Sequence, residues 1–401
     1  MIQNISSLQT SSAVKKKIMK IIFYLSITVL FIYSCNGNKT NQQETIVTNI
    51  TESSVSDISI KKATHFSVEF HENYKLVSVI NPGKGSEKTF RYLLVNKGTQ
   101  APDINADAII QVPIERMVCF STTHLPLLEY LGKADRLVGF PNTDYISSDE
   151  IRKLVQEGKV KDLGSDMDVN VEELLVLQPD IVMAYSMGDH TNQFQLIQRG
   201  GIPVVYNADF MENNPLGRAE WIKFMALFFN EEEKADSIFN AIEERYKSLK
   251  SLVENVEKKP TVFCGILYGE SWIMPGSRNF GAQFFKDAGA KYLWDDNDEE
   301  GNIRFSFEHV YEKAHDADFW IGVGSYSNLR EMQKTDKRYA VFKAFKDRNI
   351  FNYNAKMGPS GGNAYFELGY LRPDMILSDL IKIFHPEKLS EEPFYFHQSL
   401  K

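Results

Sequence analysis

The fold is decided by one stretch of the sequence, Val171-Glu172-Glu173-Leu174-Leu175-Val176-Leu177-Gln178-Pro179-Asp180-Ile181-Val182. Its apolar spacing predicts a helix over 171–177 that ends before Pro179, followed by a buried strand over 181–185. A weaker copy of this unit begins at Phe307-Glu308-His309-Val310 and continues to Ala317-Asp318-Phe319-Trp320. Two copies of one helix–strand unit predict two related lobes of the α/β class.

The alternation of strand and helix extends outward from this stretch in both directions. Before the long helical region, strands are expected at 117–120, 136–140 and 203–206, with helices at 125–131, 193–200 and 215–229. After it, strands are expected at 261–267, 319–323 and 350–353, with helices at 281–288, 307–313, 339–345 and 374–383. Such alternation indicates mostly parallel sheets that are covered on both faces.

The most helical part of the chain lies between the two halves. Over 231–257 the apolar residues recur three and four positions apart, which predicts one long helix with a single apolar stripe. At 1.5 Å per residue it would be on the order of 40 Å long, more than one small lobe needs. We therefore expect it to bridge an N-terminal lobe over 113–230 and a C-terminal lobe over 258–388.

The segment over 61–112 has a different pattern. Runs such as Phe66-Ser67-Val68-Glu69-Phe70 alternate between apolar and polar residues, and turn residues separate them. We expect a small antiparallel β extension.

The N-terminus carries a short apolar run, 21–34, that follows four lysines and ends directly before Cys35. The run is too short to span a bilayer, which needs about 20 apolar residues, so a signal peptide over 1–35 is the better interpretation. The junction resembles a bacterial lipobox, in which the cysteine carries lipid; an uncleaved anchor and an ordinary secretory signal are the alternatives. A polar, flexible tether follows over 36–60.

Composition limits the partners. The chain of 401 residues has a net charge of −8 and no basic stripe, which argues against a nucleic-acid partner. Cys119 and Cys264 lie inside apolar runs, so two free buried thiols are expected, although a disulfide between them stays open.

Three segments carry a resemblance to a known family. They are Arg116-Met117-Val118-Cys119-Phe120-Ser121-Thr122-Thr123, Leu131-Gly132-Lys133-Ala134-Asp135-Arg136-Leu137-Val138-Gly139, and 172–182 as quoted above. They resemble the binding lobe of periplasmic proteins that serve ABC importers of iron complexes and vitamin B12. The run from Tyr365 to Leu380, with His385-Pro386, resembles the ending of the iron-complex branch. The similarity covers roughly 113–386.

The resemblance implies a class III binding protein with two Rossmann-like lobes and a rigid bridging helix. Such a protein is no enzyme and holds no cofactor; it captures an iron chelate (siderophore or haem) or cobalamin between its lobes. Its partners would be an ABC permease and ATPase, and we expect a monomer, anchored by lipid in the cell envelope and facing the periplasm.

Glu172 and Glu308 are the predicted docking residues, because members of the family present one exposed glutamate on each lobe to permease arginines. The alternative is that each is simply a first-turn glutamate favoured by the helix dipole. Glu173 is the second choice for the first position.

Ligand is expected at the loops that follow strand carboxyl ends. The candidates are mostly aromatic or hydroxylated, which suits a large flat ligand, and two arginines would suit an anionic chelate. They are Ser121, Thr122, Tyr145, Tyr185, Met187, Tyr206, Tyr268, Trp272, Arg278, Arg304 and Tyr326. The alternative for each is a solvated loop side chain or a cover for its own lobe.

Two other functions stay open. His124 and His190, with Asp189, follow N-lobe strands and suit a direct carrier of zinc or manganese, although the matching C-lobe loops supply no histidine. A cleft enzyme acting on a tetrapyrrole or chelate is the other, but no catalytic motif is present. The glycine-rich 358–362 lacks the ending of a phosphate loop and is expected at the cleft as a mobile loop.

Overall fold

The computed structural model describes residues 58–80, 82–83, 87–185, 191–389 and 393–401. The chain divides into two compact units, Met1–Ser53 and Ser54–Lys401, and every element below belongs to the second. The expected signal peptide and nearly all of the expected tether lie outside the described residues. Among the described helices, none is long and apolar enough to cross a membrane.

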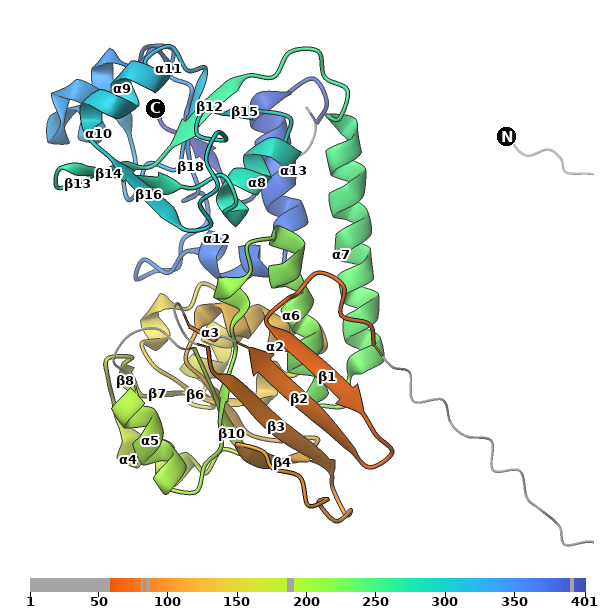
Figure 1. Cartoon of the computed structure of the whole chain (residues 1–401). Coiled ribbons are helices and arrows are strands. Elements are labelled where there is room, and N and C mark those ends of the chain that lie inside the picture. Colours follow the sequence, from red (N-terminus) through yellow and green to blue (C-terminus); the bar gives the residue numbers. More distant parts are fainter. Residues whose placement is uncertain (1–57, 81, 84–86, 186–190, 390–392) are drawn as a thin grey trace, which may run out of the picture. The chain divides into compact units, whose positions relative to one another are not determined.

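A four-stranded sheet opens the described chain (Figure 1). Its strands are β1 (Phe66–Phe70), β2 (Tyr74–Ile80), β3 (Thr89–Asn96) and β4 (Ala108–Val112). β1, β2 and β3 pair antiparallel, but β4 runs parallel to β3. The expectation of an antiparallel extension was therefore wrong. Residues 97–107 lead the chain back to the end of the sheet at which β3 begins, so that β4 runs in the same direction as β3.

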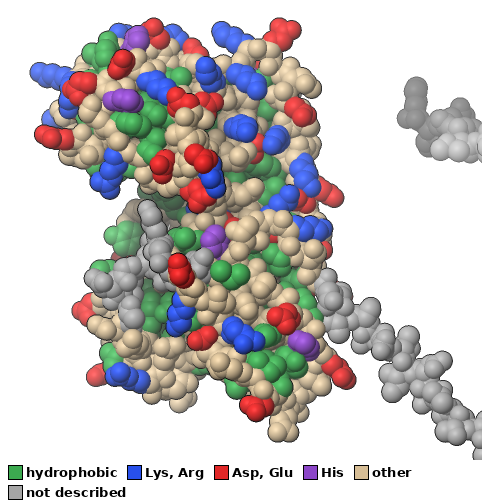
Figure 2. Space-filling model, in the orientation of Figure 1, with side chains coloured by type: hydrophobic (Ala, Val, Ile, Leu, Met, Phe, Trp, Pro, Cys, Tyr) green, Lys and Arg blue, Asp and Glu red, His purple; other side chains and the backbone are tan. Residues whose placement is uncertain are grey.

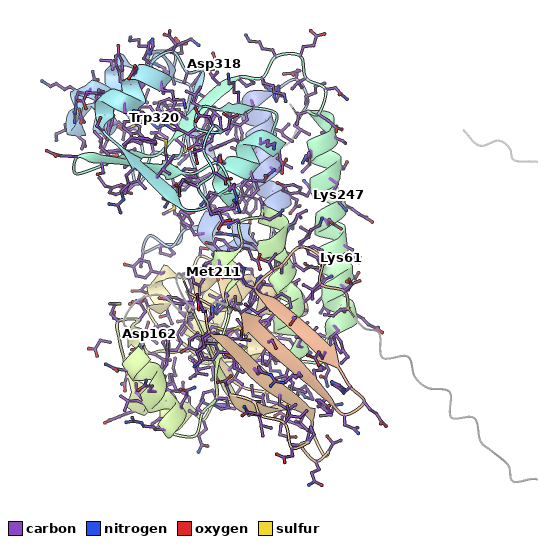
Figure 3. All side chains as sticks on the ribbon, viewed as in Figure 1. Lys61, Asp162, Met211, Lys247, Asp318 and Trp320 are labelled. Atoms are coloured by element: carbon purple, nitrogen blue, oxygen red, sulfur yellow. The ribbon has the colours of Figure 1, made fainter. Side chains whose placement is uncertain are left out.

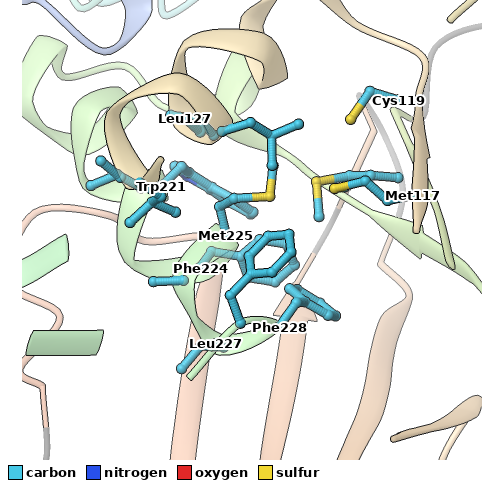
Figure 4. Close-up of a cluster of buried hydrophobic side chains, with 14 of the residues drawn as sticks. Met117, Cys119, Leu127, Trp221, Phe224, Met225, Leu227 and Phe228 are labelled. Atoms are coloured by element: carbon cyan, nitrogen blue, oxygen red, sulfur yellow. The ribbon is translucent and has the colours of Figure 1, made fainter. Parts of the chain in front are cut away.

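This sheet shares one hydrophobic core with the N-terminal lobe. Phe66 lies 4.7 Å from Trp221 and 5.4 Å from Phe224, measured between ring centroids. Figure 4 shows Trp221 and Phe224 beside Met225 and Met117 in the same cluster. The segment over 61–112 is thus part of the N-terminal lobe, and its sheet buries one face there.

The N-terminal lobe, called the N-lobe below, contains a five-stranded parallel sheet in the order β11-β10-β5-β6-β7. The strands are β5 (Met117–Cys119), β6 (Leu137–Phe140), β7 (Lys161–Asp162), β10 (Ile181–Ala184) and β11 (Val204–Tyr206). The connections carry α2 (Leu125–Leu131), α3 (Asp149–Gln156), α4 (Val171–Leu177), α5 (Thr191–Arg199) and the short hairpin β8 (Gly164–Ser165) and β9 (Asp168–Val169). The prediction of a mostly parallel sheet is confirmed here, whereas α3, the edge strand β7 and the β8–β9 hairpin were not anticipated.

Helix α6 (Pro215–Leu227) is buried along its whole length, and α7 (Glu232–Leu252) follows it. Phe239 of α7 belongs to the N-lobe core, whereas Tyr246 and Leu249 belong to the core of the C-terminal lobe. The 21 residues of α7 give a rod of about 32 Å. The bridging helix is confirmed, although it ends at Leu252 rather than at 257.

The C-terminal lobe, called the C-lobe below, has the sheet β15-β12-β17-β18-β19. Four strands are parallel, β12 (Thr261–Cys264), β15 (Lys291–Tyr292), β17 (Phe319–Ile321) and β18 (Ile350–Asn352), and β19 (Gln398–Ser399) pairs antiparallel with β18. Its helices are α8 (Phe280–Asp287), α9 (Phe307–Ala314), α10 (Leu329–Thr335), α11 (Lys343–Lys346), α12 (Ala364–Glu367) and α13 (Pro373–Phe384).

Both lobes also contain short 3-10 turns. Those of the N-lobe are η1 (Thr122–His124), η2 (Ala134–Arg136), η3 (Thr143–Tyr145) and η4 (Asp209–Met211), and those of the C-lobe are η5 (Lys337–Val341) and η6 (Leu368–Tyr370).

Two C-lobe predictions need correction. The expected strand over 261–267 breaks at Gly265, whose φ of +81° is incompatible with an extended strand. The chain then turns into a second, antiparallel sheet of β13 (Ile266–Tyr268), β14 (Ser271–Pro275) and β16 (Asn302–Phe305). The expected helix over 339–345 is divided between η5 and α11.

The internal repeat seen in the sequence has a structural counterpart. Asp180, directly before β10, accepts the backbone N–H groups of Glu115 and Arg116 at 2.7 and 2.9 Å. Asp318, directly before β17 and labelled in Figure 3, accepts the N–H and hydroxyl of Thr261, both at 2.9 Å. Each aspartate thus holds the start of the neighbouring strand, at matching places in the two lobes.

The two lobes also contact each other through hydrogen bonds between a C-lobe carboxylate and N-lobe backbone N–H groups. The buried carboxylate of Glu367 in α12 accepts the N–H groups of Ser147 and Ser148, each at 2.8 Å. The glycine-rich segment packs beside this contact, and a Cβ on Gly362 would lie 1.8 Å from the carbonyl oxygen of Tyr145. Glycine is therefore required where this C-lobe loop meets the N-lobe.

Both predicted thiols, Cys119 and Cys264, are free and buried, as the first of the two alternatives expected. On the face drawn in Figure 2, acidic and basic side chains are interspersed over both lobes.

Candidate functional site

The N-lobe has a cavity of about 310 Å³ at the carboxyl edge of its parallel sheet, the usual ligand position in such sheets. Four strand ends contribute to its wall: Ser121 follows β5, Asn142 follows β6, Tyr185 follows β10 and Asp209 follows β11. Tyr370, from η6 of the C-lobe, completes the wall. The cavity therefore draws on both lobes.

The wall of this N-lobe cavity is aromatic and acidic. Six of its residues carry aromatic rings, namely Phe120, Phe140, Tyr145, Tyr185, Phe210 and Tyr370. The carboxylates are those of Asp166 and Asp209, and the hydroxyls are those of residues 121–123. The wall thus offers ring faces, hydroxyls and negative charge.

Two polar groups of the wall are held in place. The Tyr185 hydroxyl donates to Asp166 Oδ2 at 3.1 Å. Burial, with the charge of Asp166, raises the pKa of Tyr185 to about 12, so it stays a hydroxyl donor. Asp209 is 3% exposed, and burial raises the pKa of its carboxyl to about 6 although Thr123 and Arg218 oppose the shift. It is therefore mostly ionised at neutral pH.

The C-lobe has a second cavity of about 290 Å³ at the matching edge of its own sheet. Gly265 follows β12, Gly322 follows β17 and Tyr353 follows β18, and Phe280 of α8 lies opposite. Tyr365 stacks on Tyr353 with a centroid distance of 4.7 Å. Among the described residues of this second wall, none is acidic.

Arg218 of α6 lies between aromatic residues of the two cavities. Its Cζ is 3.4 Å from the ring centroid of Phe280, which lines the C-lobe cavity, and 4.3 Å from that of Tyr370, which lines the N-lobe cavity. Its Nε and Nη2 donate to the carbonyl oxygens of Glu212 and Phe210, both at 3.0 Å. Its buried Nη1 has no hydrogen-bond partner among the described residues.

The predicted N-lobe ligand residues fall into three groups. Ser121, Thr122, Tyr145 and Tyr185 all line the N-lobe cavity. Tyr206 is not in that wall; its ring packs on Phe90 and Phe194. Met187 lies outside the described residues, as do Asp189 and His190.

The predicted C-lobe residues are absent from the wall of the C-lobe cavity. Tyr268 is 61% exposed at the tip of the β13–β14 hairpin, and Tyr326 is half-buried against Tyr339. Arg278 forms ion pairs with Asp298 and Glu300. Arg304 is exposed on β16.

The expectation for Trp272 needs correction. Its side chain is fully buried, and its indole N–H donates to the carbonyl oxygen of Cys264 at 2.9 Å. It packs among Phe263 and Trp320 in the C-lobe core. It therefore has no exposed surface for a ligand. The sequence predicted a loop at this position, whereas Trp272 lies on strand β14.

Several residues of the two walls were missed by the sequence reasoning. Asp209 and Phe210 come three and four residues after the end of the predicted strand at Tyr206, so the same rule of strand ends would have found them. Tyr353, by the same rule, ends another predicted strand. Asp166, Phe280 and Tyr370 carry no such signal, since they reach the walls from a hairpin, a helix and a turn.

His124, a predicted metal-binding candidate, is fully buried, and neither ring nitrogen has a hydrogen-bond partner in the part of the chain that the structure describes. Burial lowers its pKa to about 3, so the ring is neutral. Within the described ranges, no three His, Cys, Asp or Glu side chains converge as metal ligands would.

The predicted docking glutamates lie at matching places. Glu172 is exposed in the first turn of α4, behind the N-cap Asn170, and Glu308 is exposed in the first turn of α9, behind the N-cap Ser306. The pKa of Glu308 is lowered, chiefly by backbone and Ser306 hydrogen bonds. Both α4 and α9 precede strands of the repeated unit.

Two parallel sheets, each with a cavity at its carboxyl edge and joined by one long helix, define a two-lobed binding protein. The chain belongs to the periplasmic binding protein family, whose model matches residues 117–357. An uncharacterized lipoprotein of Methanocaldococcus jannaschii is 26% identical over 380 residues, 89% of each chain. An uncharacterized ABC transporter substrate-binding lipoprotein of Bacillus subtilis is 24% identical over 156 residues, 38% of this chain and 46% of that one.

Among solved structures, a periplasmic haem-binding protein from Pseudomonas aeruginosa has a TM-score of 0.55 and 17% identity. The match covers 72% of this chain and 98% of that chain. At this identity the likeness shows that the two proteins share a fold.

Proposed function

We propose that this protein is the lipid-anchored substrate-binding component of an ABC importer, and that it carries a metal complex such as an iron chelate, haem or cobalamin. The family membership supports a carrier rather than an enzyme. The name of the Bacillus subtilis relative supports a role in ABC transport. One structural observation carries the proposal. Each lobe has a cavity at the carboxyl edge of its sheet, and a wall residue of one cavity, Tyr370, lies 6.4 Å from a wall residue of the other, Phe280, between ring centroids.

The size of the cavities favours a ligand that occupies both. Each cavity alone is near the lower bound of about 300 Å³ for a small-molecule site. A chelate or tetrapyrrole is larger than one such cavity, and the Arg218 guanidinium contacts one wall residue of each, Phe280 and Tyr370. A ligand held by both lobes would stabilise them against each other.

Docking on the permease would use Glu172 and Glu308. Both carboxylates are exposed, and each is on a different lobe, so together they define the orientation of the carrier on a two-fold partner. Cys35 lies outside the described residues, and in this proposal it carries the lipid that keeps the carrier near the permease.

A thermal-shift panel of haem, cobalamin and ferric siderophores tests the proposal. A ligand present at 100 times its dissociation constant stabilises the folded state by about 2.7 kcal/mol. If no metal complex of the panel raises the melting temperature, the proposed cargo is wrong.

A further inference from the structure

We infer that the N-lobe cavity selects metal complexes with a net positive charge, and rejects anionic ones. The inference rests on the proposed function, because it specifies the charge of the proposed cargo. It differs from the sequence-based expectation, in which Arg278 and Arg304 faced an anionic chelate. Neither arginine is among the described residues that line the N-lobe and C-lobe cavities.

The composition of the wall carries the inference. Among the described residues that line the N-lobe cavity, six are aromatic, two are acidic and none is basic. Aromatic ring faces carry negative electrostatic potential and attract cations, most strongly where water is excluded. Carboxylates beside such faces add to the attraction, whereas an anion would meet only repulsion from both.

Both carboxylates belong to residues that line the N-lobe cavity. Asp209 is held by the side chain of Thr123 and is ionised at neutral pH, because its pKa of about 6 lies below 7. Asp166 accepts the hydroxyl of Tyr185 with its Oδ2. A cation between them would find one carboxylate on the β8–β9 hairpin and one after β11.

The positive groups nearby do not reverse this charge. Arg218 is the basic residue that lowers the pKa of Asp209, but two of its nitrogens donate to backbone carbonyls and it does not line the cavity. Glu212 is close enough to raise the same pKa and adds a negative charge. His124 is neutral because of its burial. Three carboxylates against one guanidinium leave the region negative.

The predicted anion-binding arginine, Arg278, is poorly placed to hold an anionic ligand. The guanidinium of Arg278 is exposed and already pairs with Asp298 and Glu300. An anionic ligand would have to compete with two carboxylates for that side chain. In the C-lobe cavity, the described wall offers His397 as its only ionisable nitrogen, and that ring contacts Asp379 Oδ2 at 3.1 Å.

The test uses ligands that share one metal-complex core within a series and differ in charge. Ferrioxamine B carries a free amine and is cationic; its N-acetyl derivative is neutral, and its N-succinyl derivative is anionic. Diaquacobinamide, which is cationic, and dicyanocobinamide, which is neutral, form a second series on a corrin. Binding to the full chain in detergent is measured by titration calorimetry at neutral pH and moderate salt.

The expected result is that, in at least one series, the cationic member binds at least about ten-fold more tightly than its neutral partner, which corresponds to about 1.4 kcal/mol. Asp166→Asn and Asp209→Asn should each remove most of that preference. Asp168→Asn is the matched control, because Asp168 is exposed on the adjacent strand and does not line the cavity. It should change the affinity less than two-fold, since exposed charges are screened.

The outcomes separate the two claims. If neutral or anionic members bind as tightly as cationic ones, or if the Asp166→Asn and Asp209→Asn variants keep the preference, the charge inference is wrong and the proposed carrier function stands. If no complex in either series binds, and haem also fails to bind, the proposed function fails and this inference fails with it.

Discussion

Glu220 is the centre of a buried polar network that holds the beginning of the described chain. Its fully buried carboxylate accepts the backbone N–H groups of Lys61, Lys62 and Ala63 at 3.0, 2.5 and 2.9 Å; Lys61 is labelled in Figure 3. It also pairs with the buried ammonium of Lys223 at 3.1 Å. This network fixes the point at which the N-lobe begins, directly after the segment that leads to Cys35.

Glu220→Ala should therefore destabilise the protein strongly. The change leaves three N–H groups without their acceptor, and leaves Lys223 with Asp236, at 2.8 Å, as its one remaining carboxylate partner. Removing one member of a buried ion pair costs about 3–5 kcal/mol. We take about 3 kcal/mol, because the N–H groups are only partly buried and water can replace the acceptor.

The melting temperature reports this loss. At about 2–4 °C per kcal/mol, the expected decrease is about 6–12 °C, measured by circular dichroism. Hydrogen exchange should accelerate at the amides of residues 61–63. Glu244→Ala is the control, since Glu244 is exposed on α7 and its loss should change stability by about 0.5 kcal/mol at most. A decrease of less than about 2 °C for Glu220→Ala, with unchanged exchange, would refute the reasoning.

Four further predictions concern docking, the lipid anchor, packing at Gly362 and the titration of Asp209. Reversing the charge of Glu172 and Glu308 together should abolish uptake and leave ligand affinity intact; normal uptake would contradict the docking proposal. Cys35→Ala should release the protein from membranes in a fractionation assay, and continued membrane association would reject the lipid anchor. Gly362→Ala should cost about 1–3 kcal/mol in a melting experiment, because the new Cβ would meet a backbone oxygen of the N-lobe at 1.8 Å. Burial raises the pKa of Asp209 from 3.8 to about 6, so its contribution to stability is fully present below about pH 3.8 and is lost as the pH rises through 6. Asp209→Asn should remove that part of the pH dependence in melts between about pH 4 and 7, and an unchanged pH profile would show that Asp209 does not titrate in this way.

The elements that the sequence predicted well are those with local signals. Helix α2 ends at Leu131 as expected, because Gly132 adopts a φ of +68° and closes it. Helix α4 spans 171–177 as expected, with Asn170 capping its first turn and Gln178 in the left-handed conformation before Pro179. Each of these signals acts within a few residues, so the chain itself displays it.

The elements that the sequence missed depend on distant partners. In the β13-β14-β16 sheet, Trp272 pairs with Phe305, a residue far along the chain. Nothing near Trp272 distinguishes a buried strand residue from an aromatic residue at a loop end. The placement of the C-lobe ligand candidates was therefore beyond local reasoning. Four N-lobe candidates, which follow strands or lie in the loop after β6, line the N-lobe cavity, and their contact with ligand stays a prediction.

The sequence by itself determined the two α/β lobes, the bridging helix and the edge of each sheet at which a cavity lies. These features follow from apolar periodicity and from turn residues, which act over one or two helical turns. Only the tertiary structure decided what the N-lobe cavity is made of. Asp166 and Tyr370 reach one wall from a hairpin and from the other lobe, and no spacing in the chain relates them to the strand ends. The charge of that wall depends on burial and on neighbours in space, and both exist only in the folded protein.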